Sequence, residues 1–361
     1  MDIGLVRERK TGEGRVALVP ADAAAVTAAG HRLWVERGAG RKAGFDDADY
    51  ARAGARLCED AGTVWSRADV LVKVKEPLPE EWPWLRPGLR LFCFLHLAAQ
   101  PALLAVLRDK HVTALAFETV QDAAGRLPLL APMSRIAGRL AVLWGGHYLL
   151  APPGRRGVLL GGLDEVAPAR VVVAGAGNAG WSAARTAAAL GAAVWLFDRR
   201  EAALGDSLGR APGPGVIAGR PMDPATFGEA LEGAELFVGA VLLPGARAPR
   251  LLSRADLGRL APGAVLADVS IDQGGCVETS RPTGYDAPVY EVDGVLHFCV
   301  ANIPGAVPRS ASVALSAALR PLLLRLAELG DPAGDPMLAA GINVRDGEIA
   351  HPALADPDVS R

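Results

Sequence analysis

Short runs of apolar residues alternate with segments rich in alanine and leucine along almost the whole chain. The apolar runs have the length of buried strands and the segments between them have the composition of helices, so the alternation is typical of an α/β protein with parallel sheets. In the first part of the chain this pattern predicts strands at Met1–Val6, Arg32–Val35, Val70–Val74, Arg90–Phe94 and Thr113–Ala116, and helices at Ala21–Ala29, Asp47–Ala53 and Pro101–Leu107.

A second strand–helix series follows a long predicted helix, Pro132 to about Leu150, and a glycine-rich loop at Arg155–Gly162. Its predicted elements are strands at Arg170–Ala174, Ala193–Phe197, Val216–Ala218, Leu236–Gly239, Ala264–Val269 and Val295–Cys299, and a helix over about Ala179–Leu190. A long amphipathic helix at Arg309–Leu329 then returns toward the first domain. We therefore expect two doubly wound Rossmann-like domains with a cleft between them, residues 131–306 being inserted into a discontinuous domain of residues 1–130 and 307–361. The pattern leaves the fold of the tail from Asp331 open.

Composition narrows the class of protein. The chain has 361 residues, enough for two domains, and 50% hydrophobic with 22% charged residues excludes a disordered chain. With 38 Lys+Arg against 40 Asp+Glu, the net charge of −2 gives no electrostatic reason to expect nucleic acid or an anionic membrane as a partner. The N-terminal residues lack the apolar core of a signal peptide, and the longest uncharged stretch, Leu91–Leu107, reads as a strand and a turn. These features predict a soluble, cytoplasmic protein.

The four cysteines form no CxxC pair, which argues against a zinc ribbon or a redox dithiol; they are Cys58, Cys93, Cys276 and Cys299. We expect them to be small buried hydrophobic residues, and we predict no metal site.

A dinucleotide site is predicted by three glycines, Gly175, Gly177 and Gly180, in GxGxxG spacing between a strand and a helix. The first allows a tight turn, the second lets the backbone approach a pyrophosphate, and the third allows close packing of helix on strand. The helix N-terminus offers free N–H groups to the phosphates. The alternative is a glycine turn in a doubly wound sheet that binds no nucleotide.

Asp198 closes the second strand of this motif and can accept hydrogen bonds from both ribose hydroxyls. Its charge would repel a 2′-phosphate, so NAD is favoured over NADP. Arg199 and Arg200 follow directly and could bind such a phosphate, which leaves NADP as the alternative.

Three cationic candidates stand where predicted strands end: Lys75, His96 and Arg15. In VLVKVKEP the alternation sets Lys73 and Lys75 on one face of a strand, and ligands bind at the carboxyl ends of parallel strands. The other interpretations are a solvated edge face for the lysines, a structural role for His96 and a surface position for Arg15. In the second domain, Asp268 and Asp272 flank a strand end and could form a cap or turn, or one could face the cleft beside the nicotinamide.

Several of these segments together resemble the alanine dehydrogenases. They are EGRVALVP, ERGAG with GFDDADY, LVKVKEP, LHLAA, FETVQ with GRLPLLAPMSRIAGRLA, GRRGVLLGG, GAVLLPGARAPRLL, DVSIDQGGCVETSRPT and VANIPGAVPRSAS. They cover roughly residues 1 to 330 and are shared in part with the nucleotide-binding subunits of proton-translocating transhydrogenases, from which the DQGG and HLAA segments set this chain apart.

The resemblance implies an NAD-dependent dehydrogenase that reversibly deaminates L-alanine to pyruvate and ammonia, a cytoplasmic homo-oligomer and commonly a hexamer. It implies that Arg15 and Lys75 bind substrate and that His96 and Asp272 form the catalytic pair. It also places Met133 and Asn302 at the substrate, and at the cofactor it places Ser134, Gly175, Gly177, Asn178, Ala179, Gly180, Asp198, Val241 and Leu242. The discontinuous domain would then be catalytic and the inserted one would bind NAD.

The chain departs from the family pattern near both ligands. Phe94 stands where a tyrosine is common and Ile303 where a methionine is frequent, while Trp181 is bulky for the first turn of a nucleotide-binding helix. A homologue acting on another small amino, imino or 2-oxo acid therefore stays an alternative, as does an NAD-binding subunit without turnover.

Overall fold

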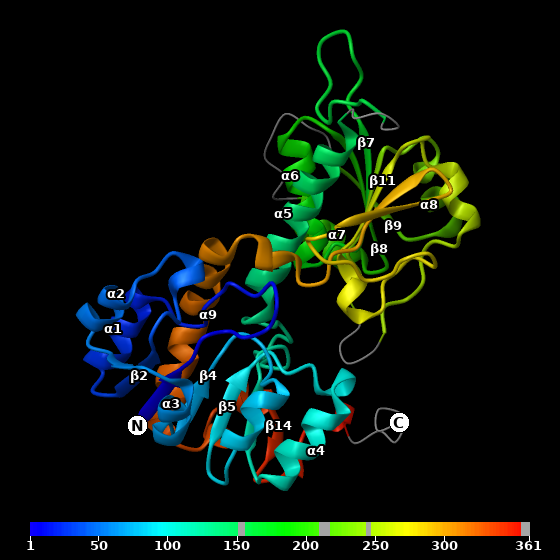
Figure 1. Cartoon of the computed structure of the whole chain (residues 1–361). Helices are drawn as coiled ribbons and strands as arrows, with labels where there is room; N and C mark the ends of the chain where they lie inside the picture. The colour runs from blue at the N-terminus through cyan, green and yellow to red at the C-terminus, as the bar shows by residue number, and fades with distance from the viewer. Residues whose placement is uncertain (151–155, 209–216, 243–246, 355–361) are drawn as a thin grey trace. The chain divides into compact units, whose positions relative to one another are not determined.

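The computed structural model of the chain describes residues 1–150, 156–208, 217–242 and 247–354 (Figure 1). It divides into two compact units, the first made of Met1–Met133 and the chain from Gly305 onward, the second of Ser134–Pro304. Helix α5 (Leu130–Leu149) begins in the first unit and continues in the second. Each unit is built around one sheet.

The first unit contains an eight-stranded sheet in the order β15-β14-β6-β5-β4-β1-β2-β3. The strands are β1 (Asp2–Leu5), β2 (Arg32–Glu36), β3 (Arg56–Cys58), β4 (Val70–Val72), β5 (Arg90–Cys93), β6 (Thr113–Ala116), β14 (Ile342–Arg345) and β15 (Glu348–Ile349). Strands β1 to β6 pair in parallel, and β14 and β15 extend the β6 edge in antiparallel. Because β1 has β2 on one side and β4 on the other, strand order reverses between β1 and β4, which is where such sheets bind ligands.

Helices cover this sheet, and several of them begin at a proline or at a capping aspartate. They are α1 (Pro20–Ala28), α2 (Asp47–Arg52), α3 (Ala61–Arg67), α4 (Pro101–Asp109), α9 (Pro308–Leu329) and α10 (Pro336–Gly341). Proline stands at the first turn of α1, α4, α9 and α10, where its missing N–H is not needed. The Asp60 side chain caps α3 by accepting a hydrogen bond from the Thr63 N–H at 2.8 Å.

The second unit contains a seven-stranded sheet in the order β12-β13-β11-β10-β7-β8-β9. Its strands are β7 (Arg170–Ala174), β8 (Ala193–Asp198), β9 (Ile217–Pro221), β10 (Leu236–Gly239), β11 (Val265–Asp268), β12 (Val289–Val292) and β13 (Val295–Phe298). Its other helices are α6 (Asn178–Ala189), α7 (Glu201–Leu208) and α8 (Pro224–Leu231). Only β12 is antiparallel, and strand order reverses between β7 and β10.

The predicted fold class, an α/β chain with two doubly wound sheets, is confirmed. Two differences concern antiparallel strands that the pattern did not predict: β12, which pairs with β13, and the β14–β15 pair formed by the tail after Asp331. Both hairpins turn on an Asp-Gly pair in the left-handed region, Asp293–Gly294 and Asp346–Gly347, which is a hairpin signal present in the sequence. The short β3, α3, α7 and α8 were also not predicted, and the predicted positions Arg155 and Val216 lie outside the described residues.

The four cysteines are free and buried, as predicted. Within the part of the chain that the structure describes, α9 is the one helix with the length and apolar composition of a membrane span, and 44% of that apolar window is buried inside the protein. The core helix of a globular domain has the same properties, and α9 packs on α1 in the first unit.

Candidate functional site

In the first unit, three predicted site residues follow three neighbouring strands. Arg15 follows β1, Lys75 follows β4 and His96 follows β5, and β4 pairs with both of the other strands. Pairing continues past the strand ends, since the Phe94 N–H donates to the carbonyl of Val74 at 3.0 Å. The sheet therefore brings Arg15, Lys75 and His96 to its carboxyl edge, beside the reversal of strand order.

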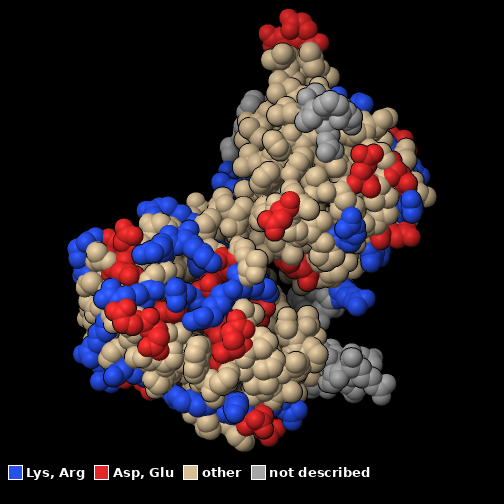
Figure 2. All heavy atoms as spheres, in the orientation of Figure 1, with Lys and Arg blue, Asp and Glu red and all other residues tan. Residues whose placement is uncertain are grey.

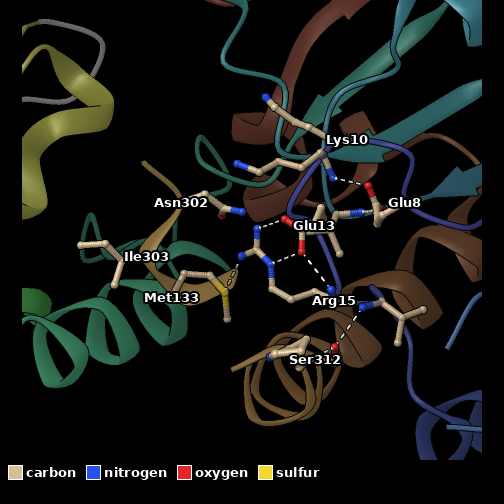
Figure 3. Close-up of polar contacts among 12 residues, drawn as sticks. Glu8, Lys10, Glu13, Arg15, Met133, Asn302, Ile303 and Ser312 are labelled. Carbon is tan, nitrogen blue, oxygen red and sulfur yellow. Dashed lines mark hydrogen bonds and ion pairs between the residues drawn. The ribbon is translucent and has the colours of Figure 1, made fainter. Parts of the chain in front are cut away.

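Arg15 is buried and tied to Glu13, which the sequence did not mark as a site residue (Figure 3). Its Nε donates to Glu13 Oε1 at 2.7 Å and its Nη2 to Oε2 at 2.5 Å, while Nη1 reaches the sulfur of Met133 at 3.1 Å. Arg15 is 3% exposed and Glu13 is 1% exposed, so the interpretation of Arg15 as a surface residue is wrong. A paired, buried guanidinium is a well-oriented donor for a carboxylate.

The loop that carries Arg15 is fastened to α9, almost 300 residues later in the chain. Ser312 Oγ accepts the N–H of Val16 at 2.9 Å, and Ser316 Oγ accepts the N–H of Val19 at 3.0 Å. Both serines lie on the buried face of α9. The C-terminal part of the first unit thus positions a loop of its N-terminal part.

The two lysines of VLVKVKEP have different environments. Strand β4 ends at Val72, and Lys73 beyond it is buried, with its Nζ 2.6 Å from Glu81 Oε2. Lys75 is half-buried. The interpretation of this segment as a solvated edge is wrong, because β4 lies between β1 and β5. Because Lys73 follows a central strand and is buried, its charge needs a partner, and Glu81 provides it.

Glu8 holds the backbone that leads to Lys75. Its carboxylate accepts the N–H of Val74 at 2.5 Å and the N–H of Lys75 at 3.2 Å. Burial raises the pKa of Glu8 to about 7, although the positive charge of Lys73 and the hydrogen bond from Val74 oppose that rise. Glu8 is therefore a carboxyl group that can change its charge near neutral pH.

His96 is exposed and has a strained backbone. Its φ of 48° and ψ of 42° lie in the left-handed region, which is uncommon for a residue with a side chain. Glu118 holds this turn by accepting the His96 N–H at 2.6 Å, and the imidazole stacks on Phe94 with ring centres 6.0 Å apart. Phe94 is thus a flat apolar support for the His96 ring.

A cavity of about 400 Å³ adjoins Arg15 in the first unit. Its lining is rich in basic residues and consists of Arg7, Glu8, Arg9, Gly14, Arg15, Gly38, Ala39, Lys42 and Glu80. Lys and Arg side chains also gather on the face of the first unit that Figure 2 shows. The surroundings of Arg15 therefore favour an anionic ligand.

In the second unit, the glycine loop follows β7 at the other reversal of strand order. Gly175 has a φ of 103°, and a Cβ there would lie 2.4 Å from the carbonyl oxygen of Ala240. A Cβ on Gly180 would lie 1.7 Å from the oxygen of Gly175, so both glycines are required by the fold itself. At Gly177 a Cβ would meet nothing within 4 Å, which leaves open space in front of the α6 N-terminus where a pyrophosphate fits.

Helix α5 approaches the same turn. A Cβ on Gly138 would lie 1.9 Å from the carbonyl oxygen of Ala179 in the first turn of α6, next to Asn178. Ser134 stands one helical turn before Gly138 and therefore on the same face of α5. This close contact brings Ser134 to the glycine-loop end of the second sheet.

Asp198 ends β8 at this edge of the sheet and is 8% exposed. Its carboxylate accepts the N–H of Ala176 at 2.7 Å and the N–H of Arg200 at 2.8 Å, and Arg200 Nε lies 3.3 Å away. Burial alone would raise the pKa of Asp198, but these hydrogen bonds hold it below its ordinary value. Asp198 is thus a stable anion attached to the glycine loop.

The remaining candidates follow β10, β11 and β13 at the same edge. Val241, next to Leu242, exchanges two hydrogen bonds with the Ser270 hydroxyl, at 3.1 and 2.8 Å. Asp268 is fully buried and is the cap, accepting the Ser270 N–H at 3.0 Å, whereas Asp272 is exposed. Asn302 has a φ of 60° and its N–H donates to Asp272 at 3.4 Å. The two aspartates that the sequence left open therefore have different environments.

Sequence reasoning missed the glutamates that hold these groups, namely Glu8, Glu13 and Glu118. Glu13 stands two positions before Arg15 in GEGR, in the irregular segment between β1 and α1, so no helix or strand period marks it. Among the described residues, no group of three or more His, Cys, Asp or Glu side chains is placed to hold a metal ion.

Comparison with known proteins matches both units. The model of the N-terminal domain of alanine dehydrogenase/PNT matches residues 4–137, and that of the C-terminal domain matches residues 141–352. The chain belongs to the alanine dehydrogenase/PNT family. The family predicted from the sequence is thereby confirmed, and the chain is placed among oxidoreductases.

Members of this family are similar to the chain over nearly its full length. An alanine dehydrogenase of Mycolicibacterium smegmatis is 45% identical over 98% of this chain and 96% of its own, and one of Bacillus subtilis is 43% identical over 98% and 94%. A solved L-alanine dehydrogenase has a TM-score of 0.92 at 42% identity, covering 99% of this chain and 100% of its own. A transhydrogenase from Sinorhizobium meliloti has a TM-score of 0.82 at 26% identity, covering 98% and 100%. The TM-score and the sequence identity are both higher for the solved dehydrogenase than for the transhydrogenase.

Proposed function

We propose that this chain is an NAD-dependent L-alanine dehydrogenase that reversibly converts L-alanine to pyruvate and ammonia. The observation that carries the proposal is the buried Arg15 at the strand reversal of the first unit, with Lys75 and His96 following the neighbouring strands. Alanine dehydrogenases with 41–46% identity over nearly the whole chain support the same substrate.

The second unit fits a nicotinamide dinucleotide. The open space at Gly177 and the α6 N-terminus would take the pyrophosphate, and Asp198 would accept the ribose hydroxyls. When bound, the cofactor supplies a hydride acceptor at its nicotinamide ring. We propose NAD rather than NADP because the ionised Asp198 repels a 2′-phosphate and its carboxylate also binds Arg200. The other cofactor contacts that we propose are Ser134, Gly175, Asn178, Ala179, Gly180, Val241 and Leu242.

The first unit supplies the groups that bind the acid. Arg15 would hold the substrate carboxylate, and Lys75 would polarise the carbonyl oxygen of the 2-oxo acid. Met133 touches Arg15 and would limit the room for the substrate side chain, and Asn302 is a further proposed polar contact of the substrate. These groups fix the substrate before the chemical step.

After hydride has left Cα, water adds to the imino carbon and ammonia is expelled, and both steps need proton transfers near neutral pH, which suit an imidazole. His96 is exposed at the sheet edge and oriented by Phe94 and Glu118, so it would donate and accept these protons. Asp272 is the proposed partner that orients the water or the amine. Alanine substitution of either residue is expected to abolish turnover and to leave NADH binding intact, and wild-type turnover would overturn its assignment.

The chain is proposed to work as a cytoplasmic homo-oligomer, a hexamer by family resemblance. Large apolar side chains that are at least half exposed on the second unit support an association between copies; they include Leu143, Leu159, Leu163 and Val166. Light scattering on the purified protein measures the number of subunits.

The alternative substrate is another small 2-oxo or imino acid, and the observation that favours it is that Phe94 in the first unit and Ile303 in the second are both apolar and buried. NADH oxidation with ammonia and a panel of 2-oxo acids tests both substrates. Highest kcat/KM with pyruvate supports alanine, and activity only with larger acids supports the alternative. NADH binding without turnover on any acid would make the chain a cofactor-binding subunit.

A further inference from the structure

The carboxylate of Glu13 is buried beside Arg15 and has no role in the proposed function. We propose that Glu13 is a positioning residue, which holds the guanidinium of Arg15 in one orientation so that the substrate carboxylate binds on its Nη1 side. This inference rests on the proposed function, in which Arg15 binds the carboxylate of a 2-oxo acid.

Glu13 accepts hydrogen bonds from both the backbone and the guanidinium of Arg15. Glu13 Oε1 accepts the backbone N–H of Arg15 at 2.9 Å and its Nε–H at 2.7 Å, and Oε2 accepts Nη2 at 2.5 Å (Figure 3). The side chain is thereby fixed at both ends by one carboxylate. A guanidinium has five N–H groups in a rigid plane, so fixing its Nε edge also fixes the direction of Nη1.

The backbone around the pair is itself held in place. Glu13 donates its N–H to the carbonyl of Lys10 at 3.0 Å, and its own carbonyl accepts a hydrogen bond from Lys42 Nζ at 3.2 Å. Between the two partners, Gly14 packs closely on α9, because a Cβ there would lie 3.2 Å from the Cβ of Pro308. The backbone of Glu13 is therefore held in place, so that its carboxylate can orient Arg15.

Burial decides whether Glu13 positions Arg15 or competes with the substrate for it. The Glu13 side chain is fully buried and that of Arg15 is 2% exposed. A substrate carboxylate that displaced Glu13 would break three hydrogen bonds and separate a buried carboxylate from its buried cation, which is strongly unfavourable. By contrast, Nη1 donates to the thioether of Met133, a weak acceptor that a carboxylate readily replaces.

Electrostatics give the pair a second consequence. Since Glu13 neutralises Arg15 at 2.5 Å, the pair contributes geometry and hydrogen bonds rather than a net positive charge. The charge that attracts the substrate carboxylate would then come from the other basic residues around the site, namely Arg7, Arg9 and Lys42 of the cavity lining together with Lys75. Arg15 would select the shape of the carboxylate.

The variant Glu13→Gln tests the positioning role. Glutamine can still accept the Arg15 backbone N–H, but its amide group would place N–H donors against Nη2 and turn the guanidinium away. We expect the KM for pyruvate to rise by about ten- to a hundredfold, the worth of hydrogen bonds to charged groups, with kcat and NADH affinity little changed. An unchanged or lower KM would overturn the proposal, since a lower KM means that Glu13 competes with the substrate.

Two further variants show whether the KM effect of Glu13→Gln comes from positioning, from the loss of a charge or from misfolding. Glu348→Gln removes the same charge from an exposed position of the first unit that does not line this cavity, and should leave the KM unchanged. If E13Q unfolds at the assay temperature, Glu13→Asp keeps the charge, is shorter by one methylene group, and should raise the KM in the same direction.

A double-variant cycle shows whether Glu13 acts through Arg15. In an Arg15→Ala background, E13Q should change the KM by less than about twofold, because there is no guanidinium left to orient. An equal KM rise in both backgrounds would overturn the proposal. The proposed function fails in a different way, either by no turnover of pyruvate in the wild type or by a wild-type KM in the Arg15→Ala variant.

Discussion

Lys73 and Glu81 form an ion pair inside the core of the first unit, with Nζ and Oε2 2.6 Å apart and both side chains at most 1% exposed. Glu81 Oε2 also accepts the N–H of Leu78 at 2.9 Å, whereas Oε1 has no hydrogen-bond partner among the residues that the structure describes. The pair thus depends on its single cation to compensate a buried carboxylate.

The first prediction concerns this pair. Lys73→Met leaves Glu81 without a counter-charge and should lower the free energy of unfolding by about 3–5 kcal/mol. The double variant Lys73→Met, Glu81→Gln removes both charges and keeps the acceptor for Leu78, so it should recover most of that loss. Urea unfolding of the three proteins checks both expectations, and a double variant no more stable than the single one would contradict them.

Lys73 also shows how far the sequence can be interpreted. The alternation in VLVKVKEP correctly set Lys73 and Lys75 near a strand end, but it could not separate a structural lysine from a candidate ligand. That distinction depends on β4 being a central strand and on Glu81 reaching back to it, and both are properties of the assembled sheet. Local alternation carries no information about which strand lies beside which.

The same contrast holds for the glycine loop and the Arg15 loop. The loop after β7 was predicted because its glycines, strand and helix are contiguous in the sequence and each has a local steric reason. The loop after β1 is held by Ser312 and Ser316, almost 300 residues away, and by Glu13 in an irregular turn. No spacing rule connects such partners, so the sequence predicted Arg15 but not the groups that orient it.

The second prediction uses the raised pKa of Glu8, which is about 7 in the folded chain against an ordinary value of 4.5. Because the folded-state pKa is the higher one, protonated Glu8 stabilises the fold fully below about pH 4.5, and this stabilisation is lost as the pH rises through about 7. Glu8→Gln cannot ionise, so its unfolding free energy relative to wild type should increase over that range, by on the order of 3 kcal/mol. Unfolding measured at several pH values checks this, and parallel pH profiles for the two proteins would contradict it.

The third prediction tests the attachment of the Arg15 loop to α9. Ser312→Ala removes the acceptor of the buried Val16 N–H and should lower the unfolding free energy by about 1–3 kcal/mol. The loosened loop should also raise the KM for pyruvate more than it lowers kcat. Ser310→Ala changes an exposed serine of the same helix and is the matched control. Equal effects of the two substitutions on thermal unfolding and on KM would show that the loop does not depend on Ser312.

The last prediction separates a glycine that the cofactor requires from one that the fold requires. Gly177 has a φ of −70°, and a Cβ there meets nothing within 4 Å, so Gly177→Ala should fold with an unfolding free energy within about 0.5 kcal/mol of wild type. The same methyl group would occupy the proposed pyrophosphate space, and NADH affinity should fall at least about tenfold. At Gly180 the added Cβ would lie 1.7 Å from a backbone oxygen, so Gly180→Ala should misfold before any effect on binding can be measured. Thermal unfolding curves first show which of the two variants folds. Fluorescence titration of the folded protein with NADH then distinguishes the two roles. Wild-type NADH affinity in a folded Gly177→Ala protein would mean that the dinucleotide does not use this loop.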